Sequence, residues 1–325
     1  MLQRACWCAV AALAAAFLPG VADAQIKLDP KLSDYKAVAG VSGNIKSIGS
    51  DSMNNEMTLW QEGFYKFYPN VQIEIEGKGS STGPPALIAG TAQFAPMSRP
   101  MKSKEIDEFK NKYGFAPTAL TTSIDMLAVF VHKDNPLKGL TLKQVDAIFS
   151  STRKGGYGKA INTWGDLGLT GEWANKPIAL YGRNSASGTY GYFKEHALFN
   201  GDFRNDVKEQ PGTSSVVQGV AGDKYAIGYG GIAYKTADVR ALPLALEENN
   251  FVPAEAERAY TGEYPLARAL LVYVTYQPGR QLDPLRAEFI RYVFSKQGQQ
   301  DVLKTGYLPV TSVGAAKALK SVGLQ

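Results

Sequence analysis

The feature that most constrains the fold of this chain is a repeated succession of strand, short polar turn and helix. Residues 44–48, 71–75 and 178–181 have the alternating or continuously apolar character of strands. Each is followed by a turn rich in glycine and hydroxyl residues, and each turn leads into a helical pattern. Strands that alternate with helices predict an α/β fold built on parallel sheet, in which ligands bind beyond the carboxyl ends of the strands.

The same alternation continues to the end of the chain, with no Pro/Gly/Ser linker between independent domains. We therefore expect two lobes that share the chain, residues 25–130 with 266–325 in the first and residues 131–265 in the second. Asp125, just before the first crossing, is interpreted as a structural residue of the hinge, and the alternative is that it contacts the site. Further strands are predicted at residues 93–97, 126–131, 225–229 and 270–274, and helices near residues 53–67, 102–112, 142–150, 189–199, 285–295 and 299–304, the last two closing the chain.

The first residues have the pattern of a secretory signal peptide. Arg4 supplies a short positive region, residues 6–18 are apolar, and an A-x-A cleavage pattern follows. We predict a signal peptide at residues 1–24 and a periplasmic mature protein, because no later apolar run is long enough to span a bilayer. Both cysteines, Cys6 and Cys8, lie within this segment, so the mature chain is expected to contain no disulfide.

The charge and the scarcity of metal ligands exclude several classes of function. The formal net charge is +5, a diffuse field that favours the approach of small anions. The chain has no basic run and no basic stripe with interleaved aromatics, so no nucleic-acid partner is expected. Two histidines provide no cluster with zinc spacing, and no complete P-loop or dinucleotide motif is present. No cofactor is expected.

The polar turns carry the chemistry that the sequence offers. They comprise residues 50–52, 80–83 and 187–189, and Arg183 precedes the third. The N-terminus of a helix presents unpaired N–H groups and a partial positive charge, to which serine and threonine hydroxyls add donors. Three such turns that converge would hold a tetrahedral oxyanion, with Arg183 in a charge-assisted contact. The alternative for any single turn is that its polar residue only caps the helix.

An enzymatic alternative rests on residues 79–83, which match the G-x-S-x-G pattern with Ser81 as the nucleophile. A serine hydrolase also needs a histidine base and an acid that orients it. His132 lies in a turn after the crossing strand, and His196 lies within a predicted helix, which is a poor placement for a base. We therefore expect a binding protein and keep the hydrolase as the alternative.

The motifs, taken in order, resemble those of a known family. They are similar to the periplasmic phosphate-binding proteins of phosphate ABC importers, the PstS-like family, over nearly the whole mature chain. The resemblance implies an α/β type II periplasmic-binding fold, with two lobes on a two-strand hinge that close on the anion. It also implies a monomer that delivers phosphate to ABC transporter permease subunits. The similar segments are residues 48–53 (IGSDSM), 77–83 (GKGSSTG), 90–94 (GTAQF), 183–189 (RNSASGT) and 225–229 (YAIGY).

The resemblance further implies a set of ligand-binding residues, carried over by position. A different oxyanion, such as sulfate or arsenate, is an open alternative to phosphate. An exported scavenging protein without a transporter is another. The implied residues are Ser52, Met53 through its backbone N–H, Ser80, Arg183, Ser187, Gly188 and Thr189.

One position departs from the pattern of the family. Where well-known members have an aspartate that accepts the proton of hydrogen phosphate, this chain has Ser98. A hydroxyl repels a fully deprotonated dianion such as sulfate less than a carboxylate does. Asp51, next to Ser52, is a candidate replacement for the missing acceptor, and the alternative is that Asp51 caps its helix. Arg99 is interpreted as a solvated surface residue, and the alternative is that it adds a second positive group to the site.

Overall fold

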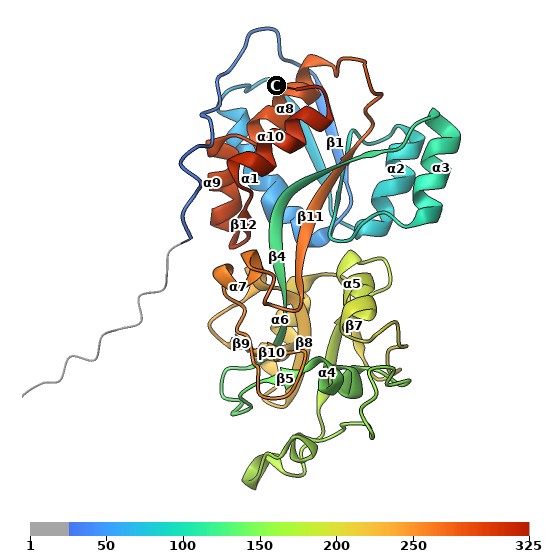
Figure 1. The fold of residues 1–325 in the computed structure, drawn as a ribbon, viewed down its shortest axis with the longest axis vertical. Coiled ribbons are helices and arrows are strands. Elements are labelled where there is room, and N and C mark those ends of the chain that lie inside the picture. The colour runs from blue at the N-terminus through green and yellow to red at the C-terminus, as the bar shows by residue number, and fades with distance from the viewer. Residues whose placement is uncertain (1–25, 325) are drawn as a thin grey trace, which may run out of the picture.

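The computed structural model describes residues 26–324, which form two lobes joined by extended strands (Figure 1). The predicted signal peptide at residues 1–24, with Cys6 and Cys8, lies outside the described residues. None of the helices within residues 26–324 combines the length and the apolar character that a membrane crossing requires.

The first lobe is built on a mixed sheet whose parallel strands end near the second lobe (Figure 1). β1 (Asn44–Ile48) pairs parallel with β2 (Gln72–Glu76) and β3 (Phe94–Met97), whereas β11 (Ala267–Val274) runs antiparallel to β3 and β4 (Thr118–His132). The turns that follow β1 and β2 therefore meet at the same edge of the sheet. The strand order is β2, β1, β3, β11 and β4, with β12 (Leu308–Pro309) also paired to β4.

Helices cover both faces of this sheet because its strands alternate their apolar side chains. On β11, Leu270, Val272 and Val274 pack into one core, and Leu271 and Tyr273 pack into the other. The first core is shared with α1 (Asn54–Tyr65), α8 (Pro284–Val293), α9 (Lys296–Thr305) and α10 (Ser312–Ser321), and the second with α2 (Gly83–Ala89) and α3 (Ser103–Tyr113).

The second lobe extends from the far end of β4. On that strand, Val129 packs with Phe193 of α5 (Gly188–His196), and Phe130 packs on the opposite face with Val217 of α6 (Thr213–Gly222). β4 pairs antiparallel with β8 (Ala226–Gly231) and β9 (Val239–Ala241), and β6 (Ala179–Arg183) pairs parallel with β8 and β7 (Lys208–Gln210). The other elements are β5 (Leu140–Thr141), β10 (Leu244–Ala245), α4 (Leu142–Phe149) and α7 (Ala256–Tyr260).

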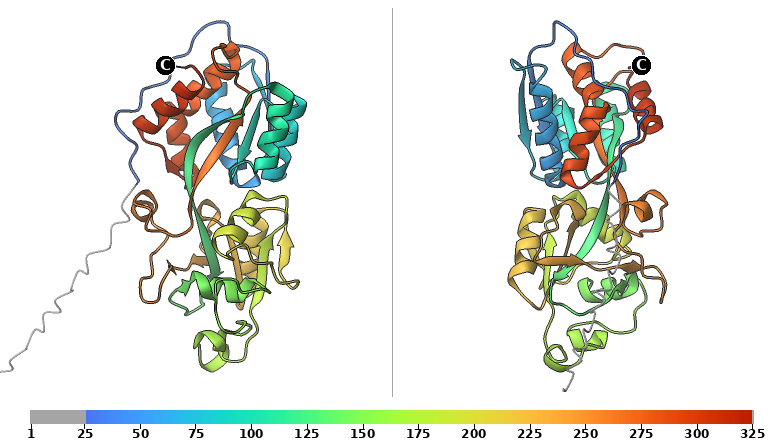
Figure 2. Two further views of the ribbon diagram at one scale, coloured as in Figure 1. Left: turned by 45° about the vertical axis from the view of Figure 1, so that its right-hand side comes forward. Right: turned by 90° about the vertical axis from the view of Figure 1, so that its left-hand side faces the viewer.

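Two long strands, β4 and β11, connect the lobes, and both are visible between them in Figure 2. β4 pairs with β11 as far as Met126 and with β8 from Leu127 onward. The chain returns to the first lobe at Ala267, which is opposite Met126. The exchange of partners occurs after residue 126, four residues before the expected crossing after residue 130.

Three α-helices of the structure, α6, α7 and α10, were not expected from the sequence. The prediction that helices near residues 285–295 and 299–304 close the chain is wrong, because α10 follows them. The buried residues of α10 are the small Ala315 and Ala318, so its apolar pattern is weak. Thr311 caps α10 by accepting the Gly314 N–H at 3.2 Å. The other two unexpected helices are α6 and the short α7.

Candidate anion-binding site

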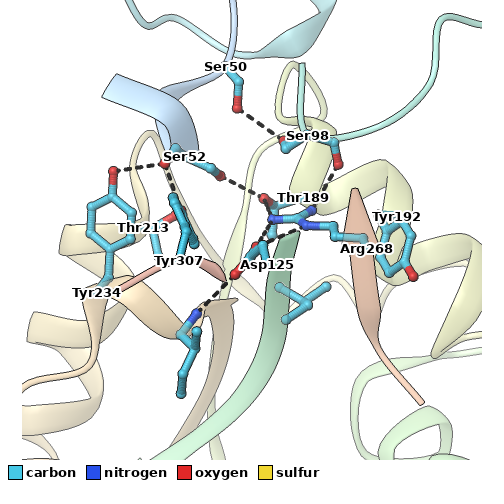
Figure 3. Close-up of polar contacts among 12 residues, drawn as sticks. Ser50, Ser52, Ser98, Asp125, Thr189, Tyr192, Thr213, Tyr234, Arg268 and Tyr307 are labelled. Carbon is cyan, nitrogen blue, oxygen red and sulfur yellow. Dashed lines mark hydrogen bonds and ion pairs between the residues drawn. The ribbon is translucent and has the colours of Figure 1, made fainter. Parts of the chain in front are cut away.

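The predicted first and third loops meet directly between the lobes. Ser52 lies in the short 3-10 helix Asp51–Met53 that follows β1, and Thr189 lies in the first turn of α5 in the second lobe. Their hydroxyl oxygens are 2.9 Å apart (Figure 3). Both residues are buried. The structure therefore brings together two residues that the sequence places 137 positions apart.

The second loop and Ser98 line the same space on the side of the first lobe. Ser80 Oγ accepts the backbone N–H of Ser98 at 3.0 Å and lies 3.2 Å from the Ser98 hydroxyl. Ser50 donates to that hydroxyl oxygen at 3.1 Å. Gly188 faces this cluster so closely that a Cβ would lie 2.3 Å from Ser80 Oγ and 2.6 Å from Ser98 Oγ. Glycine is required there by the close approach of the two lobes.

The lobes are closed over these residues. The backbone N–H of Ser81 donates to Ala186 O at 3.1 Å, from the first lobe to the second. In the opposite direction, the Tyr234 hydroxyl donates to the carbonyl oxygens of Asp51 at 3.0 Å and Ser52 at 3.4 Å. Because the hydroxyl cluster is buried by this closure, a ligand held within it must be small.

Ser187, in the third loop, caps the helix α5 that begins at Gly188. Its Oγ accepts the backbone N–H of Thr189 at 3.1 Å and of Tyr190 at 3.4 Å. The capping alternative therefore holds for this residue. A serine hydroxyl also has one proton to donate, so capping and contact with an anion are compatible.

Arg183 and Asp51 form an ion pair across the cleft. Arg183 Nη1 lies 3.3 Å from Asp51 Oδ2 and donates to Thr213 Oγ1 at 2.7 Å. Asp51 Oδ2 also accepts the N–H of Thr213, the first residue of α6, at 3.0 Å. Burial lowers the pKa of Arg183, and the charge of Asp51 opposes this shift. The alternative that Asp51 caps its own helix is wrong, because its carboxylate binds the start of a helix in the other lobe.

Met53 anchors the first loop to the hydrophobic core of the first lobe. Its side chain is fully buried among the residues that pack against α1. Its backbone N–H, the expected donor to the anion, donates to Ser50 O at 3.2 Å within the same turn. In this closed arrangement, therefore, that N–H already has a partner inside the first loop.

A second arginine, which the sequence analysis missed, lies beside the hydroxyl cluster. Arg268 on β11 is opposite Asp125 on β4, and its Nε and Nη2 donate to Asp125 Oδ2 at 3.0 and 2.7 Å. Nη2 also donates to Thr189 Oγ1 at 2.9 Å, and Nη1 donates to Ser98 O at 3.0 Å (Figure 3). The structural role expected for Asp125 is thereby explained by an ion pair between the two hinge strands.

Comparison with known proteins connects this geometry to a family. Residues 35–297 match the model of the PBP superfamily domain. The phosphate-binding protein PstS of Pseudomonas aeruginosa strain PAO1 is 55% identical over 306 residues, covering 94% of this chain and 95% of that protein. This chain belongs to the PstS family. The predicted family resemblance, the α/β periplasmic-binding fold and the expectation of a binding protein rather than an enzyme are confirmed.

Solved structures extend the likeness of this PstS family member to the fold as a whole. One is a substrate-binding protein of the phosphate ABC transporter type from Clostridium perfringens, solved with bound phosphate. It is 25% identical with a TM-score of 0.69, covering 82% of this chain and 100% of that one. A candidate phosphate-binding protein from Planctomyces limnophilus is 27% identical with a TM-score of 0.63, covering 87% of this chain and 98% of that one.

Two features of this PstS family member carried a signal that sequence reasoning passed over. Residues 211–215 (PGTSS) form a fourth turn of glycine and hydroxyl residues, and Thr213 within it contacts both Arg183 and Asp51. The other signal is a single arginine, Arg268, near the start of the otherwise apolar strand of residues 267–274.

Arg99 is not the solvated surface residue that was expected. It is 7% exposed, and its two terminal nitrogens donate to the carboxylate of Glu105 at 2.8 and 2.7 Å. Arg99 Nη2 also donates to Ser81 Oγ at 3.3 Å. Because Glu105 lies in the first turn of α3, this ion pair holds that helix against the second loop.

Glu56 is a buried acid directly behind the first loop. It lies on α1, four residues after Ser52, and is inaccessible to solvent. Burial raises the pKa of Glu56 to about 8, the Ser123 hydroxyl partly opposes this shift, and the negative charge of Asp125 adds to it. The side chain is therefore predominantly protonated at neutral pH, which avoids a third negative charge near the two ion pairs.

The hydrolase alternative has no base in position among the described residues. Ser81 Oγ accepts its hydrogen bond from Arg99. His132 Nδ1 lies 3.6 Å from Asp134, and His196 Nδ1 lies 3.1 Å from Tyr192 O, so both histidines have contacts within their own segments. Within residues 26–324, no group of three or more His, Cys, Asp or Glu side chains is placed to hold a metal ion.

Proposed function

We propose that this chain captures inorganic phosphate in the periplasm and delivers it to an ABC importer. The observation that carries this proposal is the buried cluster of hydroxyls from Ser52, Ser80, Ser98 and Thr189, contributed by both lobes. Neutral donors beside an arginine suit a tetrahedral oxyanion. The 55% identity to the phosphate-binding protein PstS of Pseudomonas aeruginosa supports phosphate as the ligand.

The proposed cycle is capture without chemistry. Ser52 and Ser80 offer hydroxyls on the first lobe, and Arg183, Gly188 and Thr189 complete the site from the second. An anion that contacts both sets stabilises the closed form, because the open form can satisfy only one set at a time. The closed protein, a monomer, then docks on the permease subunits in the membrane.

The same proposal assigns the parts of the chain. Residues 1–24 are removed on export. The expected lobes, residues 25–130 with 266–325 and residues 131–265, shift by a few residues, so that the first lobe comprises the chain up to residue 126 and from residue 267, and the second comprises residues 127–266. β4 and β11, which pair from Met126 and Ala267 through the first lobe, act as the hinge strands of the closing motion.

Asp51 takes the role of the missing acceptor in this proposal. Phosphate retains a proton at neutral pH and sulfate does not. A carboxylate in the site therefore accepts a hydrogen bond from the protonated phosphate oxygen and repels sulfate. Asp51 is suited to this because it belongs to the first loop and is held at the cleft by Arg183 and Thr213. Asp51→Asn should therefore reduce the preference for phosphate over sulfate. An unchanged ratio of the two affinities would contradict the assignment.

Isothermal titration calorimetry of the chain from residue 25 onward tests the function itself. We expect phosphate to bind most tightly, arsenate to compete because it has the same shape and protonation, and sulfate to bind weakly. A stronger response to sulfate, or no response to phosphate, would overturn the proposal. Mass spectrometry of the native protein purified from cells offers an independent measurement, because a captured anion adds its own mass.

A further inference from the structure

The hinge strands of this protein carry an arginine whose position suggests more than support for the backbone. Arg268 is 2% exposed and lies in β11, where it is paired in register with Asp125 of β4. A buried ion pair between the two strands satisfies the charge of Asp125. The pair alone, however, does not require the guanidinium to reach out of the hinge toward the loops.

The guanidinium of Arg268 extends to residues of both lobes. Nη1 donates to Ser98 O in the first lobe at 3.0 Å, and Nη2 donates to Thr189 Oγ1 in the second at 2.9 Å. Figure 3 shows the guanidinium between these two residues. By contrast, Arg183 directs its terminal nitrogens to Thr213, Pro211 and Asp51, outside the hydroxyl cluster.

The direction of these hydrogen bonds determines what Thr189 can do. An arginine only donates, so Thr189 Oγ1 must accept from Arg268. The single proton of the Thr189 hydroxyl is then directed away from Arg268, toward Ser52 Oγ at 2.9 Å or toward an anion between them. Arg268 therefore orients Thr189 as a donor to the anion and makes that donor stronger, because a cation polarises the hydroxyl.

The charges around the site also favour a role for Arg268 in binding the anion. Arg183 is paired with Asp51 and Arg268 with Asp125, so the two pairs together are formally neutral. The two arginines are close enough for the positive charge of Arg268 to add to the lowering of the Arg183 pKa, after the larger effect of burial. An anion held beside the Arg268 guanidinium would offset part of this repulsion.

We propose that Arg268 is an anion-binding residue of this site, which contributes its positive charge to the ligand and orients the Thr189 hydroxyl toward it. The inference rests on the proposed function. It assigns the recognition of charge to the hinge as well as to the third loop. Closing the lobes and completing the anion contacts then become one event, because the same guanidinium touches Ser98 and Thr189 only when the lobes are together.

The test must separate contact with the anion from support of the hinge. Arg268→Gln alone leaves the Asp125 carboxylate buried and unpaired, so it can fail to fold. The decisive variant is therefore Arg268→Gln with Asp125→Asn, which replaces the ion pair by neutral groups of similar shape. The matched control is Lys304→Gln with Asp301→Asn, which removes an ion pair on α9 of the first lobe, where the carboxylate is also buried.

Phosphate affinity of these variants is measured by calorimetry, and folding by thermal unfolding without phosphate. We expect the Arg268/Asp125 variant to bind phosphate about 100-fold more weakly and the Lys304/Asp301 control to stay within about threefold of the unmodified chain. If the Arg268/Asp125 variant bound phosphate as tightly as the unmodified chain, the inference would be overturned, because the ion pair would then serve only to support the hinge.

A double-mutant cycle that combines the Arg268/Asp125 variant with Thr189→Val distinguishes orientation of the Thr189 hydroxyl from a purely structural role of Arg268. If Arg268 acts through the Thr189 hydroxyl, the two losses of affinity are less than additive, and additive losses would contradict that part of the proposal. The unmodified chain is titrated in parallel. Its failure to bind phosphate would reject the proposed function, whereas unchanged binding by the Arg268/Asp125 variant would reject only the role of Arg268.

Discussion

Ser52 Oγ and Thr189 Oγ1 are 2.9 Å apart although they belong to different lobes. The contact exists only while the cleft is closed, so it contributes to the equilibrium between open and closed forms and not to the stability of either lobe. Ser52 is further tied to the second lobe through Tyr234, and to the first-lobe core through Tyr307, whose hydroxyl donates to Ser52 O at 2.7 Å. The position of one ligand residue is thus set by both halves of the molecule.

Replacing Thr189 with valine should weaken phosphate binding while leaving the fold intact. The change keeps the shape of the side chain but removes the hydroxyl that meets Ser52 and accepts from Arg268. We expect a loss of about 1–2 kcal/mol, or roughly five- to thirtyfold in Kd, measured by calorimetry. Thr189→Ser is the control, since it retains the hydroxyl. Equal affinity of the valine and serine variants would contradict the assignment.

A methyl group at position 188 should prevent closure. The Cβ of Gly188→Ala would lie 2.3 Å from Ser80 Oγ, much closer than atoms of these types approach. We expect phosphate binding to fall by more than about 100-fold, because the cost of the clash arises only in the closed form. Small-angle scattering with phosphate should show an extended particle.

Gly191→Ala is the matched control for Gly188→Ala. It lies on the same helix, and its Cβ would be 3.5 Å from Arg99 Cδ, which is an ordinary contact. We expect this variant to close and to bind phosphate normally. Normal binding by Gly188→Ala as well would show that the lobes can approach each other differently.

The Arg183–Asp51 pair should behave as a unit in binding. Arg183→Gln leaves the Asp51 carboxylate in the cleft without its cation, so the negative charge repels the incoming anion. We expect a loss of about 2–3 kcal/mol in phosphate binding and partial recovery in the Arg183→Gln/Asp51→Asn double variant. Calorimetry of all four combinations measures the coupling. Strictly additive effects would mean that the two residues act independently.

Glu56 should make the stability of the protein decrease as the pH rises from weakly acid to weakly alkaline. Its pKa is about 8 in the folded chain, against an ordinary value of 4.5. Between those two values the folded chain binds more protons than the unfolded chain, so the free energy of unfolding falls as pH rises. The contribution is complete below about pH 4.5 and lost above pH 8, with a slope of up to about 1.4 kcal/mol per pH unit.

Glu56→Gln should remove this dependence, because a buried amide cannot ionise. The measurement is chemical denaturation of both proteins across that pH range. Glu62→Gln, on the same helix but without burial, is the control and should leave the profile unchanged. A profile for Glu56→Gln that parallels the original would place the ionising group elsewhere.

Much of the fold could be predicted because it depends on local patterns. The strand at Asn44–Ile48 was expected with its observed bounds, and α3 and α4 differ from their expected ranges by about one residue. α10 was missed because its buried residues are alanines, which give a helix little apolar periodicity. The length of β4 was underestimated because its first residues alternate in burial, whereas the later ones are uniformly apolar.

The site was predictable where ligands share a loop and unpredictable where they depend on tertiary contacts. Ser52, Ser80 and Thr189 follow strands, so their convergence was expected from the topology. Arg268 and Asp125 are 143 residues apart, and only the pairing of the hinge strands places one opposite the other. The contacts of Asp51 with the other lobe could not be predicted either, because a carboxylate at the start of a helix ordinarily caps that helix.

The passage of the chain between the lobes also determines the order in which its parts can form during synthesis. The second lobe is one uninterrupted segment, and its ends are joined where Leu127 N donates to Leu266 O at 3.0 Å. The first lobe needs both ends of the chain, since Phe64 packs edge-on against Phe289 with ring centroids 5.3 Å apart. A growing chain can therefore complete the second lobe before Phe289, the packing partner of Phe64, has been synthesised. The ability to hold an anion arrives last, when the C-terminal helices are made.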